Sequence, residues 1–128
     1  KIILLLYMQN KITLVLGACL NPIRYSNMAI CRLSENAIEV KAFGLKKGRV
    51  SGVDIDTELM PYQNIHNVTL YLNPKRQEAY YEYIIGLNPQ RVIFNPGTEN
   101  PQLYKLLSDA SIHYEVACTL VLLSTNQY

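Results

Sequence analysis

The sequence predicts an α/β domain built as a three-layer, doubly wound parallel sheet with a Rossmann-like arrangement. Short apolar segments rich in β-branched residues alternate with segments whose apolar residues recur at helical spacing. Asparagine–proline pairs stand between these segments, and five of the six prolines follow an asparagine. Because such pairs favour turns and helix starts, they divide the chain into strand and helix units. This alternation predicts right-handed crossovers and helices on both faces of the sheet.

The first unit is a strand followed by a helix. Residues 12–16 (ITLVL) are apolar and rich in β-branched residues, which is typical of a strand buried on both faces. Asn21 and Pro22 predict a helix that begins there, because asparagine is a good N-cap and proline is favoured at the first helical position. The apolar face of this helix is expected to comprise Ala29, Ile30, Leu33 and Ala37.

The remaining elements follow the same punctuation. Further strands are expected at residues 37–43, 68–72, 91–94 and 113–118, and a glycine-containing stretch with Gly44, Gly48 and Gly52 follows the first of them. Further helices are expected from Asn73-Pro74 to an end marked by Gly86 and Pro89, from Asn100-Pro101 onward, and at residues 119–124.

Length and composition fit one globular domain. The chain has 128 residues, of which 49% are hydrophobic and 17% are charged. We expect residues 11–128 to form the domain and residues 1–10 to be an N-terminal extension, with Met8 as the native start. The apolar run at residues 2–8 is much shorter than the roughly 18 to 20 residues that span a bilayer, so we expect no membrane partner.

Charge and cysteine content narrow the classes of partner and the compartment. A net charge of +2 is too small for the basic stripe of a nucleic-acid-binding protein. The three cysteines, Cys19, Cys31 and Cys118, lack the paired spacing of a zinc site or of a disulfide framework. We therefore expect a cytoplasmic protein that binds neither nucleic acid nor metal.

The turn after the first strand is a candidate anion site. In a doubly wound sheet, ligands bind beyond the carboxyl ends of the strands, where the following helix presents free N–H groups. Arg24 near the helix start indicates a bound anion, because the helix dipole disfavours a cation there. Ser26 and Tyr25 could add hydroxyl contacts. The alternatives are an unoccupied turn and an Arg24 side chain that extends into solvent.

A nicotinamide dinucleotide fits this turn poorly. After Gly17, the glycine positions of the G-x-G-x-x-G fingerprint hold Cys19 and Pro22. The second strand ends without the acidic residue that holds the ribose hydroxyls. Lys46 and Lys47 follow it instead, and this basic cluster suits either a phosphorylated ribose or a solvated loop.

These segments resemble the stand-alone Rossmann-type coenzyme A-binding domains, relatives of the nucleotide-binding domain in the succinyl-CoA synthetase alpha subunit. The resemblance extends from about Lys11 to Tyr128. Its markers are GACLNPIRYSNMA, the glycine-containing stretch after the second strand, NPGTEN and VACTLVLL. The family commonly has serine where this chain has Cys19.

The resemblance implies a site for coenzyme A or an acyl-CoA, rather than a reaction. Its implied contacts with the phosphates are Gly17, Ala18, Cys19, Arg24, Tyr25 and Ser26, and Asn21 and Pro22 of the same turn are also implied to bind the cofactor. Those implied beside the adenosine and its ribose phosphate are Phe43, Gly44, Lys46 and Lys47. Those implied on the opposite rim are Asn73, Pro74, Asn95, Pro96 and Gly97.

The sequence offers little catalytic machinery. His66 and His113 are expected near strand starts, at the end of the sheet opposite the ligand. Glu99 is the one carboxylate expected near the cleft. Cys19 or Cys118 could form a mixed disulfide with the ligand thiol, or both could be small structural residues. A binding or regulatory module is the first expectation. An NADP- or acyl-CoA-dependent enzyme, an interaction protein with a vestigial nucleotide site, and a homodimer or partner enzyme subunit stay open.

Overall fold

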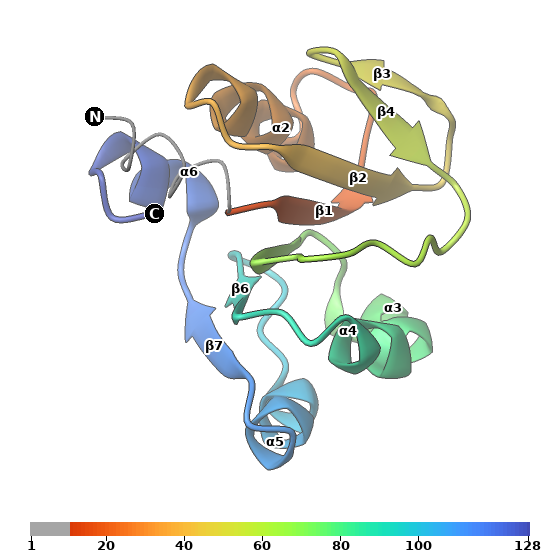
Figure 1. The fold of residues 1–128 in the computed structure, drawn as a ribbon, viewed down its shortest axis with the longest axis vertical. Helices are drawn as coiled ribbons and strands as arrows, with labels where there is room; N and C mark the ends of the chain where they lie inside the picture. Colours follow the sequence, from red (N-terminus) through yellow and green to blue (C-terminus); the bar gives the residue numbers. More distant parts are fainter. Residues whose placement is uncertain (1–10) are drawn as a thin grey trace.

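The computed structural model describes residues 11–128, which form one mixed sheet flanked by helices (Figure 1). The strands are β1 (Thr13–Ala18), β2 (Val40–Gly44), β3 (Gly48–Val50), β4 (Val53–Asp56), β5 (Asn67–Leu70), β6 (Arg91–Phe94) and β7 (His113–Val116). The helices are α2 (Tyr25–Glu35), α3 (Pro74–Gln77), the 3-10 helix η1 (Glu78–Tyr80), α4 (Tyr81–Leu87), α5 (Pro101–Asp109) and α6 (Thr119–Ser124). The expected extension at residues 1–10 lies outside the described residues.

The strand order places a topological switch point beside β1. The order is β3-β4-β2-β1-β5-β6-β7, so the chain moves from β1 to β2 on one side and later to β5 on the other. Apart from β3, which pairs antiparallel with β4, neighbouring strands are parallel. This confirms the Rossmann-like α/β class, in which such a switch point creates a crevice for ligands.

Two helical layers cover the sheet (Figure 1). Helices α2 and α6 lie on one face, and α3, α4 and α5 lie on the other. Successive side chains of β1 point to opposite faces of the sheet, so both faces need a helical layer. Leu14 and Leu16 pack in one core cluster with Leu107 of α5, whereas Val15 packs in the other with Ile30 of α2. All five of these side chains are fully buried. The period of two along the strand thus supplies both faces of the core. No helix in residues 11–128 is long and apolar enough to cross a membrane.

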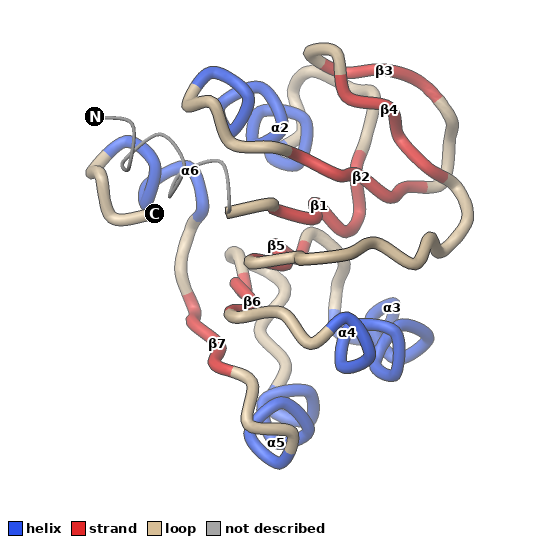
Figure 2. The backbone as a smooth tube through the Cα atoms, viewed as in Figure 1, coloured by secondary structure: helices blue, strands red, loops and turns tan. Residues whose placement is uncertain are grey.

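The expected loop after the second strand is a β-hairpin, and the sheet is therefore not uniformly parallel. Val50 pairs with Val53 across a tight turn at Ser51 and Gly52, whose φ angles are 49° and 77°. Positive φ at both turn positions matches the twist of a two-residue hairpin. A long loop, rather than a helix, then joins β4 to β5 (Figure 2). The strand–helix alternation expected from the sequence fails in this part of the chain.

Helix α2 begins at Tyr25, and the prediction of a start at Asn21-Pro22 is wrong. The Asn21 side-chain oxygen accepts a hydrogen bond from the Ile23 N–H at 3.1 Å, and the Arg24 N–H donates to the Asn21 carbonyl at 3.0 Å. These two bonds close a turn before the helix starts. Arg24 therefore occupies the N-cap position, where its side chain forms no capping bond.

The other two asparagine caps are confirmed. Asn73 accepts from the Arg76 N–H at 2.9 Å, and Asn100 accepts from the Leu103 N–H at 3.4 Å. The single helix expected after Asn73 is instead divided into α3, η1 and α4. Gly86 lies inside α4, which ends where Asn88 adopts a left-handed φ of 47°.

The bounds of the other elements lie close to those expected from the sequence. The strand at residues 91–94 and the helix at residues 119–124 have the expected bounds. The strands expected at residues 12–16, 37–43, 68–72 and 113–118 shift at their ends by a few residues. Such shifts are normal where hydrogen-bond pairing, rather than composition, decides the terminal residue.

Candidate functional site

Two clefts open beside the carboxyl ends of β1, β2 and β5. The larger has a volume of about 650 Å³ and the smaller has a volume of about 220 Å³. Both are lined by Arg24, Ser26, Tyr71 and Leu72, so they meet at the start of α2. The larger cleft alone falls within the size range of cofactor pockets.

Close backbone contacts shape the floor of the larger cleft. A Cβ atom on Gly44 would lie 2.3 Å from the Ala18 carbonyl oxygen, so the end of β2 could not approach β1 with any other residue. Gly17 has a φ of +103°, and a Cβ there would lie 3.0 Å from the Tyr71 carbonyl carbon. Glycine at both positions lets the strand ends come together beneath the cleft.

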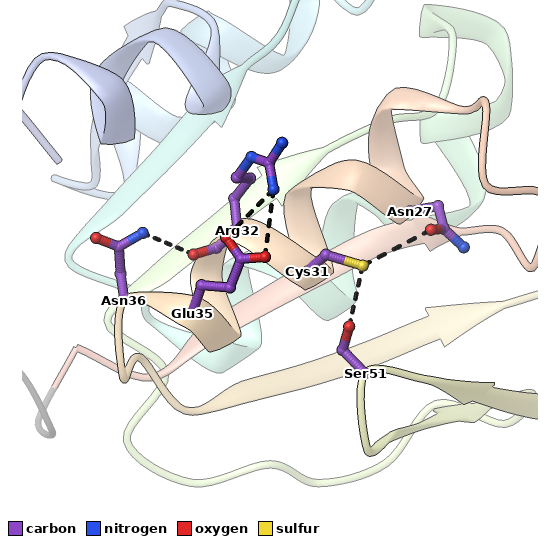
Figure 3. A network of polar contacts seen from close by, with 6 residues as sticks. All are labelled: Asn27, Cys31, Arg32, Glu35, Asn36 and Ser51. Atoms are coloured by element: carbon purple, nitrogen blue, oxygen red, sulfur yellow. Dashed lines mark hydrogen bonds and ion pairs between the residues drawn. The ribbon is translucent and has the colours of Figure 1, made fainter.

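The turn between β1 and α2 is held in place by Asn27. This side chain is 6% exposed, and its Nδ2 donates to the Cys19 carbonyl at 2.9 Å. The Asn27 Oδ1 accepts a long hydrogen bond from the Cys31 thiol at 3.9 Å, and the Ser51 hydroxyl donates to the Cys31 sulfur at 3.0 Å. Figure 3 shows this path from α2 to the β3–β4 turn. The turn between β1 and α2 is therefore fixed to the body of the sheet.

Buried amides hold the opposite rim. Gln77 is fully buried, and its Nε2 donates to the carbonyls of Leu72 and Thr98, each at 2.8 Å. Leu72 and Thr98 both line the smaller cleft. Because one amide holds both carbonyls, the segments after β5 and β6 keep a fixed spacing. The rim is thus preorganised by internal hydrogen bonds.

Two arginines line the larger cleft and form no ion pair within the described residues. Three of the five arginines form ion pairs: Arg32 with Glu35, Arg49 with Asp54, and Arg91 with Glu115. Within residues 11–128, Arg24 and Arg76 form no ion pair, and both line the larger cleft together with Lys46. Among the described residues lining either cleft, none is Asp, Glu or His. The site is therefore electropositive in a chain of small net charge.

Most of the site residues expected from the sequence line one of the clefts. The larger cleft includes Gly17, Ala18, Cys19, Asn21, Phe43, Gly44 and Lys46. The smaller includes Tyr25, Asn73, Pro96 and Gly97. Arg24 and Ser26 line both.

Four expected residues line neither cleft: Pro22, Lys47, Pro74 and Asn95. Asn95 is 2% exposed, and its Nδ2 donates to the Thr69 hydroxyl at 2.7 Å and to the Leu70 carbonyl at 2.8 Å. Its Oδ1 accepts from the Thr119 N–H at 2.9 Å. The side chain of Asn95 thus joins β5 and β6 to α6.

Sequence reasoning missed several lining residues: Leu20, Leu45, Tyr71, Leu72, Arg76, Ala79, Tyr80 and Thr98. Tyr71 and Leu72 were expected inside a strand, but β5 ends at Leu70 and leaves them at the cleft. Burial raises the pKa of the Tyr71 hydroxyl to about 12. Arg76 lies in the first turn of α3, after Asn73. A cation near a helix start is the same signal that indicated Arg24 in the sequence, because the helix dipole disfavours it there.

The histidines lie at the opposite end of the sheet, as expected. His66 directly precedes β5, and His113 is the first residue of β7. Burial, with smaller contributions from Lys11 and Arg91, lowers the pKa of His66. Near the smaller cleft, Glu99 accepts a hydrogen bond from the Gly97 N–H at 2.8 Å. In the described part of the chain, no three His, Cys, Asp or Glu side chains are grouped as metal ligands.

The cysteines differ in their relation to the site. Cys19 lines the larger cleft, whereas Cys118 is the N-cap of α6 and lines neither cleft. All three thiols are free and half-buried.

A sequence profile decides the family. The profile described as "CoA binding domain" matches residues 11–124. The chain belongs to this family. The resemblance seen in the turn motifs is thereby confirmed, and membership supports coenzyme A binding in general. Among curated proteins, no sequence matches the chain.

Solved structures share the fold of this CoA-binding domain. One described as an uncharacterized protein is 44% identical, with a TM-score of 0.90, and the match covers 92% of this chain and 98% of that chain. A hypothetical protein from Pyrococcus horikoshii OT3 is 28% identical, with a TM-score of 0.76 and coverage of 94% and 85%. A structure described as cell-free ID.343 from Thermus thermophilus is 21% identical, with coverage of 99% of this chain and 96% of that chain, and its TM-score of 0.79 supports the fold alone.

Proposed function

We propose that the chain binds coenzyme A or an acyl-CoA across the two clefts and acts as a binding or regulatory module. The observation that carries this proposal is the position of Arg24. Arg24 has no carboxylate partner in the described structure, and this exposed residue lines both clefts at the N-terminus of an 11-residue helix. An anion at this point would satisfy both the arginine and the free N–H groups of the first turn.

The arrangement suits the diphosphate of coenzyme A. Ser26 is buried in the first turn of α2, and its hydroxyl is available to the same anion that Arg24 binds. Leu20 and Leu45, which are 41% and 72% exposed, offer apolar surface at the larger cleft. Burying such side chains against a ligand adds favourable free energy to binding.

The lining of both clefts offers cations, hydroxyls and backbone N–H groups, which suit anion binding. We place the protein in the cytoplasm, since three free thiols are typical of a reducing compartment.

Titration calorimetry tests the proposal. The chain is titrated with coenzyme A, acetyl-CoA, NAD, NADP and ATP, each up to millimolar concentration. We expect coenzyme A or acetyl-CoA to bind most tightly, because the turn lacks the glycines of the dinucleotide fingerprint. Preference for NAD or NADP, or binding of none of the five, would overturn the proposal.

A pair of arginine variants locates the binding in the clefts. Arg24→Ala should weaken coenzyme A binding by about 1 to 3 kcal/mol, the usual loss for a charge-assisted hydrogen bond. Arg32→Ala is the matched control, because Arg32 lies on the same helix but pairs with Glu35 in an exposed ion pair. Equal affinities for the two variants would contradict the assignment of Arg24.

A further inference from the structure

Arg76 is a second cation that lines the larger cleft, and no carboxylate of the described structure pairs with it. Its backbone N–H bonds to Asn73, but within residues 11–128 its guanidinium forms neither an ion pair nor a hydrogen bond. Its neighbour Lys75 is also exposed and carries the same charge, yet lines neither cleft. Of these two adjacent cations, only Arg76 lines the larger cleft.

The wall that carries Arg76 faces a second wall with its own cation. Arg76, Ala79 and Tyr80 line the larger cleft from α3 and η1, at the spacing of one helical face. The segment from Phe43 to Lys46, which follows β2, lines the same cleft. The rings of Phe43 and Tyr80 meet edge to face with centroids 5.5 Å apart, so the two walls join at this contact.

The cations are distributed unequally between the clefts. Arg24 belongs to both clefts, whereas Lys46 and Arg76 belong only to the larger. A diphosphate at the start of α2 therefore lies between the two clefts. Lys46 and Arg76 are left to meet a second anionic group, separate from the diphosphate and on the larger-cleft side.

Coenzyme A carries such a group. It has a phosphate on the ribose, which lies on the nucleoside side of its diphosphate, whereas the pantetheine arm on the other side is uncharged. We propose that Arg76 is a specificity-determining residue that binds this ribose phosphate together with Lys46. The nucleoside then occupies the larger cleft, and the pantetheine arm runs through the smaller. This inference rests on the proposed function, and it adds Arg76 to the ribose-phosphate contact that the family resemblance already implies for Lys46.

Two ligands and two variants test the inference by calorimetry. Coenzyme A is compared with dephospho-coenzyme A, which lacks only the ribose phosphate, on the wild type, Arg76→Gln and Lys75→Gln. We expect Arg76→Gln to weaken coenzyme A binding at least about tenfold, because a charge-assisted contact is lost. Its affinity for dephospho-coenzyme A should stay within about twofold of the wild type, as should both affinities of Lys75→Gln.

The outcomes separate the two proposals. Wild-type binding of coenzyme A, with unchanged affinity in Arg76→Gln, would overturn the role of Arg76 and leave the proposed function standing. An equal loss for both ligands in Arg76→Gln would also overturn it, since Arg76 would then act on the diphosphate or on the fold. If the wild type binds neither coenzyme A nor dephospho-coenzyme A, the proposed function is overturned, and this inference with it.

Discussion

Asparagine has three different roles in this protein. Asn27 holds the Cys19 carbonyl of the turn between β1 and α2, Asn73 caps α3, and Asn95 joins β5 and β6 to α6. Asparagine suits all three positions because its amide both donates and accepts.

At the same scale, His66 predicts a pH dependence of stability. Burial, Lys11 and Arg91 lower its pKa from 6.5, so the unfolded chain binds this proton more readily than the folded protein. The contribution of His66 is therefore complete above pH 6.5 and is lost as the pH falls through the folded-state pKa.

Urea denaturation of the wild type and His66→Gln checks this. Between about pH 7.5 and pH 5.5, the free energy of unfolding should fall more steeply in the wild type than in the variant. If the free energy of unfolding changes with pH in the same way in the two proteins, protonation of His66 does not contribute to the pH dependence of stability.

At the scale of elements, replacing glycine by alanine is expected to change the free energy of unfolding in opposite directions in β2 and α4. Gly44→Ala places a methyl group 2.3 Å from the Ala18 carbonyl, so β1 and β2 must separate beneath the larger cleft. We expect it to lower the free energy of unfolding by about 1 to 3 kcal/mol and to weaken coenzyme A binding.

Gly86→Ala is the matched control, because nothing lies within 4 Å of the added methyl group in α4. We expect it to raise the free energy of unfolding by about 0.5 to 1 kcal/mol, the usual preference for alanine inside a helix. Thermal and urea denaturation measure both changes. A neutral Gly44→Ala variant would contradict the close approach of the strand ends.

The elements that the sequence predicted best are those with strong local signals. The caps at Asn73 and Asn100 and the apolar strand at residues 91–94 depend on neighbours in the chain, and all three are present. The β3–β4 hairpin was missed because β3 has only three residues, too few to show alternation. Its pairing is decided by the positive φ angles of Ser51 and Gly52.

The candidate site was predictable to a similar extent. The turn around Gly17 and Arg24 follows from chain-local rules for strand ends and helix starts. The contributions of Tyr71 and Tyr80 depend on where the segment after β5 folds back over the sheet. No local pattern fixes that path, because the buried Gln77 amide holds it through the Thr98 carbonyl, which is 21 residues away in the sequence.

At the scale of the whole molecule, the two ends of the sheet differ in whether their arginines are paired with carboxylates. At the amino end, Arg91 pairs with Glu115 at 3.0 Å and lies 5.0 Å from the centre of the Tyr128 ring. At the carboxyl end, Arg24 and Arg76 have no carboxylate partner in the described structure. The unpaired cations give the carboxyl end a positive potential, which suits the anionic ligand proposed above. The candidate site and the paired charges of Arg91 and Glu115 thus lie at opposite edges of the sheet.

A crystal structure of the protein with coenzyme A tests this account most directly. We expect the diphosphate within hydrogen-bonding distance of the Arg24 guanidinium and of the first N–H groups of α2. We also expect the nucleoside in the larger cleft. Coenzyme A bound at the amino end of the sheet, or in the clefts with its diphosphate remote from Arg24, would contradict the central claim.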